Sequence, residues 1–178
     1  MSKLIECVAN ISEGSDLNKI DKIAMSVLNH EGVKLLNIDP GKATNRTVIT
    51  FVGPPETIVD AAYSLISKAK ELIDMRSHKG EHPRMGAVDV CPFIPISGVS
   101  MKETVDLAHQ LGKRVGSELL IPVYCYENAA KNNQRVNLAN CRSGEYEGLK
   151  NKLRDVKWKP DYGPNKFNET VAKFGAVA

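Results

Sequence analysis

The sequence lacks a long hydrophobic run, and this absence narrows the class of protein. No apolar stretch approaches the ~20 residues that a membrane-spanning helix needs. Polar and acidic side chains at Glu6, Asn10 and Glu13 interrupt the first residues, so no signal-peptide core forms there. We therefore expect a cytoplasmic protein that makes no membrane contact.

The sequence also lacks a cysteine pattern of the kind that binds zinc or builds a disulfide framework. Its four cysteines are Cys7, Cys91, Cys125 and Cys141; none forms a C-x-x-C pair, and three lie inside apolar runs. Because no secretory signal accompanies them, these spacings favour buried free thiols.

Aromatic residues and excess charge are scarce as well. The net charge is +3 in 178 residues, and Phe, Trp and Tyr make up only 6%. Nucleic-acid-binding proteins usually carry a basic stripe with interleaved aromatic residues, whereas Lys and Arg are scattered here. We therefore expect no nucleic-acid partner. The charge is still compatible with binding of a small anion, because such a ligand needs only two or three cationic side chains.

The hydrophobic pattern predicts one α/β domain that spans residues 1–178. Short β-favouring runs at 4–9, 33–38, 47–52, 87–96 and 122–126 alternate with helical spacing at 17–28, 58–73, 105–119 and 145–153. The first six elements follow the β-α-β-β-α-β order of ferredoxin-like folds, with an extra helix and strand, so we expect helices covering a mixed sheet. A capping box at Ser100-x-x-Glu103 begins the third helix. The residues after 157 are predicted to form a loose tail.

Residues 78–89 concentrate the reactive side chains. This segment carries two histidines, two cations and two carboxylates directly before an apolar strand. Loops at strand ends are where α/β proteins place functional residues, and histidine is the most ready general base near neutral pH. A polar surface loop with incidental histidines is the alternative.

The same segment matches the H-x-x-E-H pattern of inverted zinc peptidases through His78, Glu81 and His82. That site requires both imidazoles on one face of a helix. Gly80 lies between them, and Pro83 biases His82 away from the helical region. We therefore expect no metal site.

Two further polar segments lie at predicted strand ends. Asp39 lies at the end of the second strand, and the planar guanidinium of Arg46 can bind a carboxylate through two N–H groups. A plain hairpin with Gly41 in its turn would explain the same residues. Residues 10–14 leave the first strand, where backbone N–H groups could hold an anion. No G-x-G-x-x-G or Walker pattern is present, so a nucleotide is not indicated. Whether these segments meet the 78–89 loop is not fixed by the pattern.

Several stretches resemble the N-terminal subdomain of glutamate formimidoyltransferases. They are residues 6–14, residues 44–48 and, above all, residues 78–95 (HKGEHPRMGAVDVCPFIP). The similarity continues at residues 144–147 and 160–164, so it runs along nearly the whole chain. The central stretch is long enough to be highly specific.

This resemblance implies transfer of a formimino group from N-formimino-L-glutamate to N5 of tetrahydrofolate, a step of histidine degradation. It implies that His82 is the catalytic acid and base. It also implies that the folate lies in a cleft between this subdomain and a second one, and that the segment of Gly163 and Pro164 contributes to it.

Chemistry adds candidates to this implied site. We expect Asp39 to orient His82, and Arg46, Lys79 and Arg84 to bind the carboxylates of substrate and folate. Formyl transfer between 5-formyltetrahydrofolate and glutamate is an alternative, because a formyl oxygen replaces the imino nitrogen. A non-catalytic module that binds folate or a partner is the other alternative.

The sequence departs from the family pattern at its end. Residues 167–175 stand where the family pattern has a shorter segment, which puts the folate contacts of this region in question. The chain also stops where the family continues into the second subdomain. We therefore expect a C-terminal subdomain or another chain to complete the cleft, and a homodimer is compatible with this arrangement.

Overall fold

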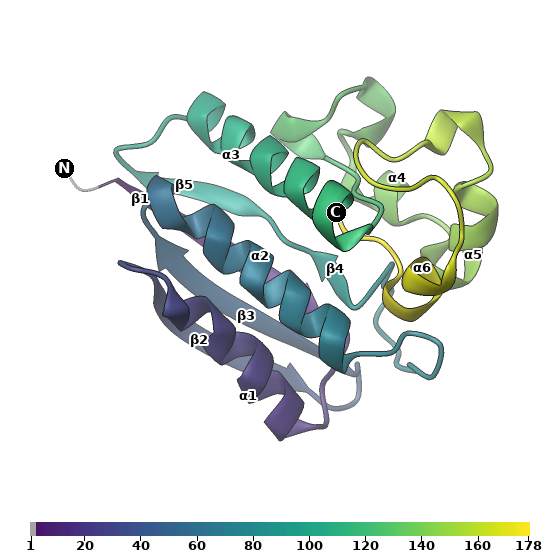
Figure 1. Cartoon of the computed structure of the whole chain (residues 1–178), viewed down its shortest axis with the longest axis horizontal. Helices are drawn as coiled ribbons and strands as arrows, with labels where there is room; N and C mark the ends of the chain where they lie inside the picture. Colours follow the sequence, from purple (N-terminus) through teal and green to yellow (C-terminus); the bar gives the residue numbers. More distant parts are fainter. Residues whose placement is uncertain (1–2) are drawn as a thin grey trace.

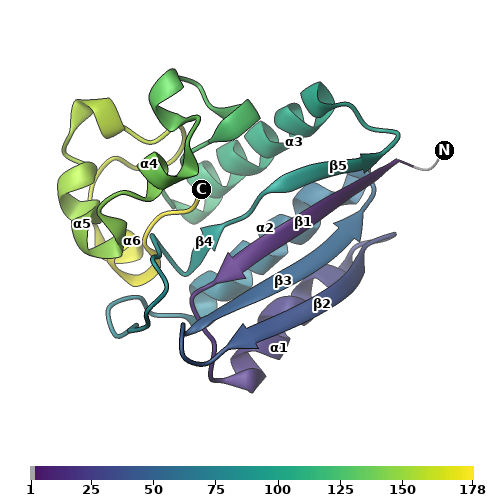
Figure 2. The ribbon, with the colours of Figure 1, turned by 180° about the vertical axis from the view of Figure 1, so that it is seen from behind.

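The computed structural model describes residues 3–178, and its centre is an antiparallel sheet (Figures 1 and 2). The strand order is β2-β3-β1-β4, and β5 pairs with the same edge of β1 as β4 does. The strands are β1 (Leu4–Ile11), β2 (Lys34–Gly41), β3 (Arg46–Gly53), β4 (Val88–Val90) and β5 (Phe93–Ser97).

This order confirms the expected ferredoxin-like core. All four strand ladders are antiparallel, so the expectation of a mixed sheet was wrong. The reason is that each helical crossover places the next strand two positions away, and the position between them is filled by a strand of opposite direction. The predicted strand at 87–96 is divided into β4 and β5, because Pro92 has no N–H with which to continue the ladder.

Helices cover one face of the sheet, and their apolar sides form the main core. α1 (Leu17–Met25) and α2 (Pro55–Leu72) lie over the sheet with their axes roughly along the strands, and α3 (Met101–Arg114) packs beside α2 and against β5 (Figure 1). Every second residue of β1 is fully buried beneath them. These residues are Ile5, Cys7, Ala9 and Ile11.

The opposite face of the sheet is not covered by a helix within residues 3–178 (Figure 2). Its side chains belong to the alternate positions of the strands and are only partly buried, including Glu6, Asn10, Arg46 and Val48. This uncovered face is named the open face below.

A layer of short elements follows α3. The predicted capping box is present, since the side chain of Ser100 accepts from the N–H of Glu103 and Glu103 bonds back. α3 continues as a π turn, η2 (Val115–Leu119). The remaining elements are η1 (Ser26–Asn29), η3 (Glu127–Ala129), η4 (Asn133–Arg135), α4 (Leu138–Arg142), α5 (Glu145–Lys152), η5 (Val156–Trp158) and α6 (Glu169–Phe174). The strand predicted at 122–126 is reduced to isolated bridges of Val123 with Tyr162 and Val177.

The last residues are buried, and the prediction of a loose tail was wrong. Residues 174–178 run between β4 and residues 122–124, where Val177 donates to Pro122 O and Ala178 donates to Asp89 O, at 3.0 Å each. Gly175 turns the chain into this position with a φ of 86°. Apolar packing therefore overrides the Pro- and Gly-rich pattern that precedes this segment.

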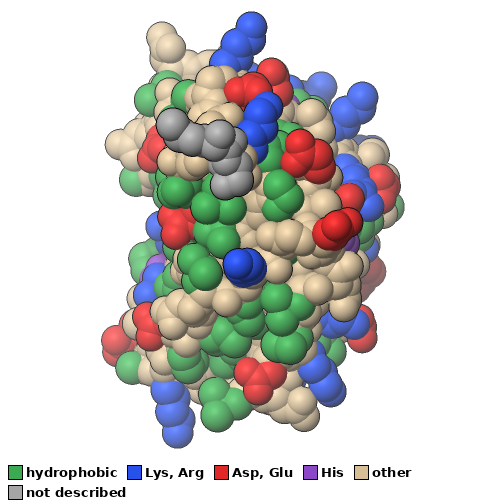
Figure 3. Space-filling model, turned by 90° about the vertical axis from the view of Figure 1, so that its left-hand side faces the viewer, with side chains coloured by type: hydrophobic (Ala, Val, Ile, Leu, Met, Phe, Trp, Pro, Cys, Tyr) green, Lys and Arg blue, Asp and Glu red, His purple; other side chains and the backbone are tan. Residues whose placement is uncertain are grey.

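The remaining sequence expectations concern thiols and membranes. All four cysteines are free; three are buried and Cys91 is partly buried. Among residues 3–178, no helix combines the length and the apolar character that crossing a bilayer requires. Figure 3 views the end of the molecule where the chain begins, and hydrophobic and charged side chains are intermixed there.

Candidate functional site

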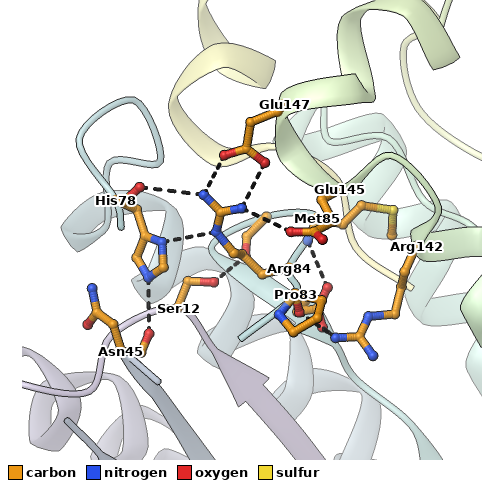
Figure 4. A network of polar contacts seen from close by, with 11 residues as sticks. Ser12, Asn45, His78, Pro83, Arg84, Met85, Arg142, Glu145 and Glu147 are labelled. Carbon is orange, nitrogen blue, oxygen red and sulfur yellow. Dashed lines mark hydrogen bonds and ion pairs between the residues drawn. The ribbon is translucent and has the colours of Figure 1, made fainter. Parts of the chain in front are cut away.

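Three polar segments meet at the end of the sheet where β1 finishes, and Asn45 joins them. The Asn45 side chain accepts from Gly14 N at 2.9 Å and donates to Lys79 O at 2.7 Å. Its carbonyl accepts from Nε2 of His78 at 3.0 Å (Figure 4). Asn45 has a φ of 47°, a left-handed conformation that asparagine tolerates better than most residues. The three segments singled out in the sequence therefore form one site.

Glycines allow these segments to approach each other closely. A Cβ atom on Gly14 would lie 2.3 Å from Gly41 O, and one on Gly80 would lie 2.5 Å from Thr44 O. Both distances are far inside van der Waals contact with backbone atoms. The 10–14 and 78–86 segments can therefore pack on the β2–β3 hairpin only with glycine at these positions.

Arg84 is buried and is the centre of a network that links the 78–86 loop to α5 (Figure 4). Its guanidinium binds both carboxylate oxygens of Glu147, at 2.7 and 2.8 Å, and its Nε donates to Nδ1 of His78 at 3.1 Å. Glu145 lies 3.4 Å away. Hydrogen bonding with Glu147 raises the pKa of Arg84 and lowers that of Glu147. The carboxylates bound to Arg84 thus come from the chain itself.

His78 has a structural place in this network. Its Nδ1 accepts from Arg84 and its Nε2 donates to Asn45 O, which defines a neutral ring. Burial lowers the pKa of His78, in agreement with this state. The loop is not helical, since α2 ends at Leu72, so His78 and His82 do not share a helical face as the zinc-peptidase pattern requires.

Arg142 and Asp89 hold the other side of the loop. The buried Asp89 carboxylate accepts from Met85 N at 2.8 Å and lies 2.7 Å from Nη2 of Arg142. The same Nη2 donates to the carbonyl of Pro83 (Figure 4). Burial raises the pKa of Asp89, and the charge of Arg142 opposes that rise.

His82 lies between these two supports and makes no hydrogen bond through its ring within residues 3–178. The ring is partly buried and lies near Arg46, Arg142 and Arg84. Burial and the charges of these arginines lower the pKa of His82 to about 4. The ring is therefore neutral at physiological pH and has a free lone pair with which to accept a proton.

Arg46 carries a charge that no carboxylate of residues 3–178 pairs with. Its Nη1 donates to Oδ1 of Asn10 at 2.8 Å, which holds the guanidinium on the open face beside the end of β1. No ion pair to Arg46 is present in the part of the chain that the structure describes. A partly buried, unpaired guanidinium next to a neutral histidine is an arrangement suited to an anionic ligand.

The remaining predicted residues are placed around this centre or away from it. Asp39 is exposed on β2 opposite Val48, which is opposite Asn10, so the three side chains share a row on the open face. Lys79 is exposed in the loop. The structure does not join Asp39 to His82 by a hydrogen bond.

Gly163 and Pro164 belong to a different part of the fold. Gly163 packs against Gly116 and the carbonyl of Ile121, where a Cβ atom would lie 2.1 Å from that oxygen. Within residues 3–178, no hydrogen bond joins this segment to the 78–86 loop. It is anchored to the end of α3 instead.

Sequence reasoning missed Arg142 and the role of Glu147. Arg142 lies in a stretch, residues 127–144, that has no hydrophobic period and no motif, so no local signal marked it. Glu147 belongs to the stretch 144–147 that carries the resemblance. Its distance from Arg84 along the chain hid the pairing.

Comparisons with known proteins agree on one family. Residues 4–178 match the formiminotransferase domain, N-terminal subdomain. The chain is 53% identical over 177 residues to the formimidoyltransferase-cyclodeaminase of Rattus norvegicus, covering 99% of this chain and 32% of that protein. It is 46% identical over 175 residues to the glutamate formimidoyltransferase of Thermoplasma acidophilum, covering 97% and 56%. The chain thus spans about a third of the first relative and just over half of the second.

Proposed function

Because the chain belongs to the formiminotransferase domain family, as its N-terminal subdomain, we propose that it supplies one half of an enzyme active site. The reaction is transfer of the formimino group of N-formimino-L-glutamate to N5 of tetrahydrofolate, in the degradation of histidine. We propose the cytoplasm as the compartment of this reaction.

The observation that carries this proposal is the state of His82. Its ring has no hydrogen-bond partner within residues 3–178, is held in a loop supported on both sides, and is neutral at physiological pH. A general base needs a free lone pair at a fixed position. A histidine that served only packing would be expected to have its ring nitrogens satisfied by the protein.

The chemistry of amidine transfer fits one histidine. N5 of the folate attacks the formimino carbon, and His82 accepts the proton that N5 loses. His82 then donates this proton to the glutamate nitrogen as the bond between that nitrogen and the former formimino carbon breaks. A single residue acts as base and then as acid, a contribution of typically ~10²–10⁴-fold to the rate.

The charge around His82 fits an anionic substrate. We assign a carboxylate of N-formimino-glutamate to Arg46, which has no acidic partner in residues 3–178. Binding of this anion would offset the cations that lower the pKa of His82, so the ring becomes a stronger base once substrate is present. Asp39, on the same open face, is assigned the orientation of the protonated ring.

The folate is assigned to the open face and its surroundings. Lys79 is exposed in the same loop as His82, and the segment of Gly163 and Pro164 is the family-implied contact. The longer relatives support a second subdomain as the cover of the open face. Arg84 could bind a substrate carboxylate only after release of Glu147, so we give it the lesser claim.

Turnover tests this proposal directly. We expect formimino transfer from N-formimino-glutamate to tetrahydrofolate when this chain is mixed with the second subdomain of a relative, and little transfer by the chain alone. His82→Asn should abolish the transfer, while His30→Asn should not, because His30 bonds Ser64 on the helical side of the sheet. Full turnover by His82→Asn would rule out the mechanism.

The same experiment separates the alternatives. Transfer from N-formyl-glutamate but not from N-formimino-glutamate would favour the formyl reaction, since both donors present a carbon of the same geometry. Calorimetric binding of tetrahydrofolate without turnover of either donor would favour a non-catalytic module. Sedimentation of the mixture decides whether the second half is a separate subdomain or a second copy of this chain.

A further inference from the structure

We propose that Arg142, held by Asp89, positions His82 for proton transfer. This inference rests on the proposed function, and it concerns a residue outside the stretches that carry the family resemblance. Arg142 contacts the backbone beside His82 and not the reacting atoms, so it is a positioning residue.

The contacts place Arg142 one residue from the histidine. Its Nη2 donates to the carbonyl of Pro83, the residue that follows His82. The same nitrogen lies 2.7 Å from the Asp89 carboxylate, whose other oxygen accepts from Met85 N. Asp89 and Arg142 thus fix the backbone at two points, Pro83 and Met85, directly after the catalytic histidine.

Both partners are anchored outside the loop. Asp89 belongs to β4 and its side chain is 2% exposed, so it cannot follow a moving loop. Arg142 ends α4, in which the carbonyls of Asn140 and Cys141 accept from the buried ammonium of Lys152. The clamp therefore ties the loop to the sheet on one side and to a fixed helix on the other.

The guanidinium also acts on His82 through its charge. The charged and titratable groups that face this ring are Arg46 from β3, Arg84 and His78 from the loop, and Arg142 from α4. Of the three arginines, Arg142 and Arg84 are compensated by carboxylates of the chain. Removing Asp89 would leave the charge of Arg142 uncompensated, whereas removing Arg142 would take that charge away.

These two contributions can be separated by substitution. Arg142→Gln removes both the charge and the clamp, and Arg142→Lys keeps the charge but cannot reproduce the planar fork. Asp89→Asn keeps Arg142 and removes its support. Arg154→Gln is the matched control, because Arg154 is exposed and has no ion pair within residues 3–178.

The first measurement is the NMR titration of the His82 ring in this chain, which needs no activity. We expect the midpoint to move upward in Arg142→Gln, to stay low in Arg142→Lys, and to move downward in Asp89→Asn. The second is turnover with the second subdomain present. We expect kcat to fall about 10- to 100-fold in all three variants with little change in KM, because misplacement of a reacting group costs roughly that much.

Opposite results would overturn the proposal. Wild-type kcat in folded Arg142→Gln and Arg142→Lys would show that the clamp does not position the ring. An unchanged His82 midpoint in Arg142→Gln would show that the guanidinium does not act on His82. If the unsubstituted chain mixed with the second subdomain has no turnover, the proposed function fails. The titration alone then decides whether Arg142 controls the proton affinity of His82.

Discussion

Asp161→Asn tests the buried ion pair that holds the segment before Gly163. Asp161 lies 2.6 Å from Nη1 of Arg135, and the two side chains are only 3% and 5% exposed. The other oxygen of Asp161 accepts from Cys125 N at 2.8 Å. An asparagine keeps the shape and can keep this hydrogen bond, but it removes the charge and turns an NH2 group towards Arg135 in place of the carboxylate oxygen.

The expected cost follows from the burial of Arg135. Removing one partner of a buried ion pair leaves an uncompensated charge and costs about 3–5 kcal/mol. The entropy of unfolding is roughly 2.1 cal/mol/K per residue, or about 370 cal/mol/K for this chain. The midpoint of thermal unfolding should therefore fall by roughly 8–13 °C.

Thermal and urea unfolding followed by circular dichroism measure this change. Asp21→Asn, on the exposed side of α1, is the matched control and should be neutral. The double variant Arg135→Met, Asp161→Asn should recover part of the loss, because it removes the stranded charge. A free energy of unfolding for Asp161→Asn within about 1 kcal/mol of that of the unsubstituted chain would refute the reasoning. Loss of the partner of a buried arginine should lower this free energy by more than that.

Three further perturbations address the site and its supports. Asn45→Ala should cost about 1–3 kcal/mol of unfolding free energy in urea, because Gly14 N and Lys79 O lose their partner; Asn45→Gly, which relieves the positive φ, should still be destabilised. The pKa of His82 is about 4 in the folded chain and near 6.5 when unfolded, so the unfolded state binds more protons between these values and stability falls as pH falls through them. His82→Asn should flatten this part of the pH profile, and an unchanged profile would contradict the lowered pKa. Gly86→Ala places a Cβ atom 2.3 Å from Ala176 O and should destabilise the chain by about 1–3 kcal/mol, with faster amide exchange in residues 174–178; unchanged exchange would show that the close approach is not present.

The elements of the core were predictable because their signals are local. Helical spacing marked α1 and α2, and the capping box at Ser100 marked the start of α3. The order of these elements along the chain was enough to indicate the split β-α-β core. Strand direction was not, since it depends on which edge each crossover returns to.

The secondary structure after residue 120 was predicted less accurately. A run of apolar residues at 122–126 has the composition of a strand, but it forms only isolated bridges, one of them with Val177 in the buried segment 174–178. The Pro and Gly residues after residue 157 indicated a loose tail. The buried side chain of Phe174 and the apolar residues that follow it favour the core.

The sequence by itself determined the nature of the site: a histidine-rich loop before a buried strand, with the residues that identify the family. Only the tertiary structure decided which side chains are free. Arg84 is engaged by Glu147, and Arg46 is left without a carboxylate partner in the described residues. Arg142 reaches Pro83 from a helix far along the chain. Periodicity and motifs report on neighbours in sequence, whereas charge compensation and proton affinity depend on neighbours in space, which only packing creates.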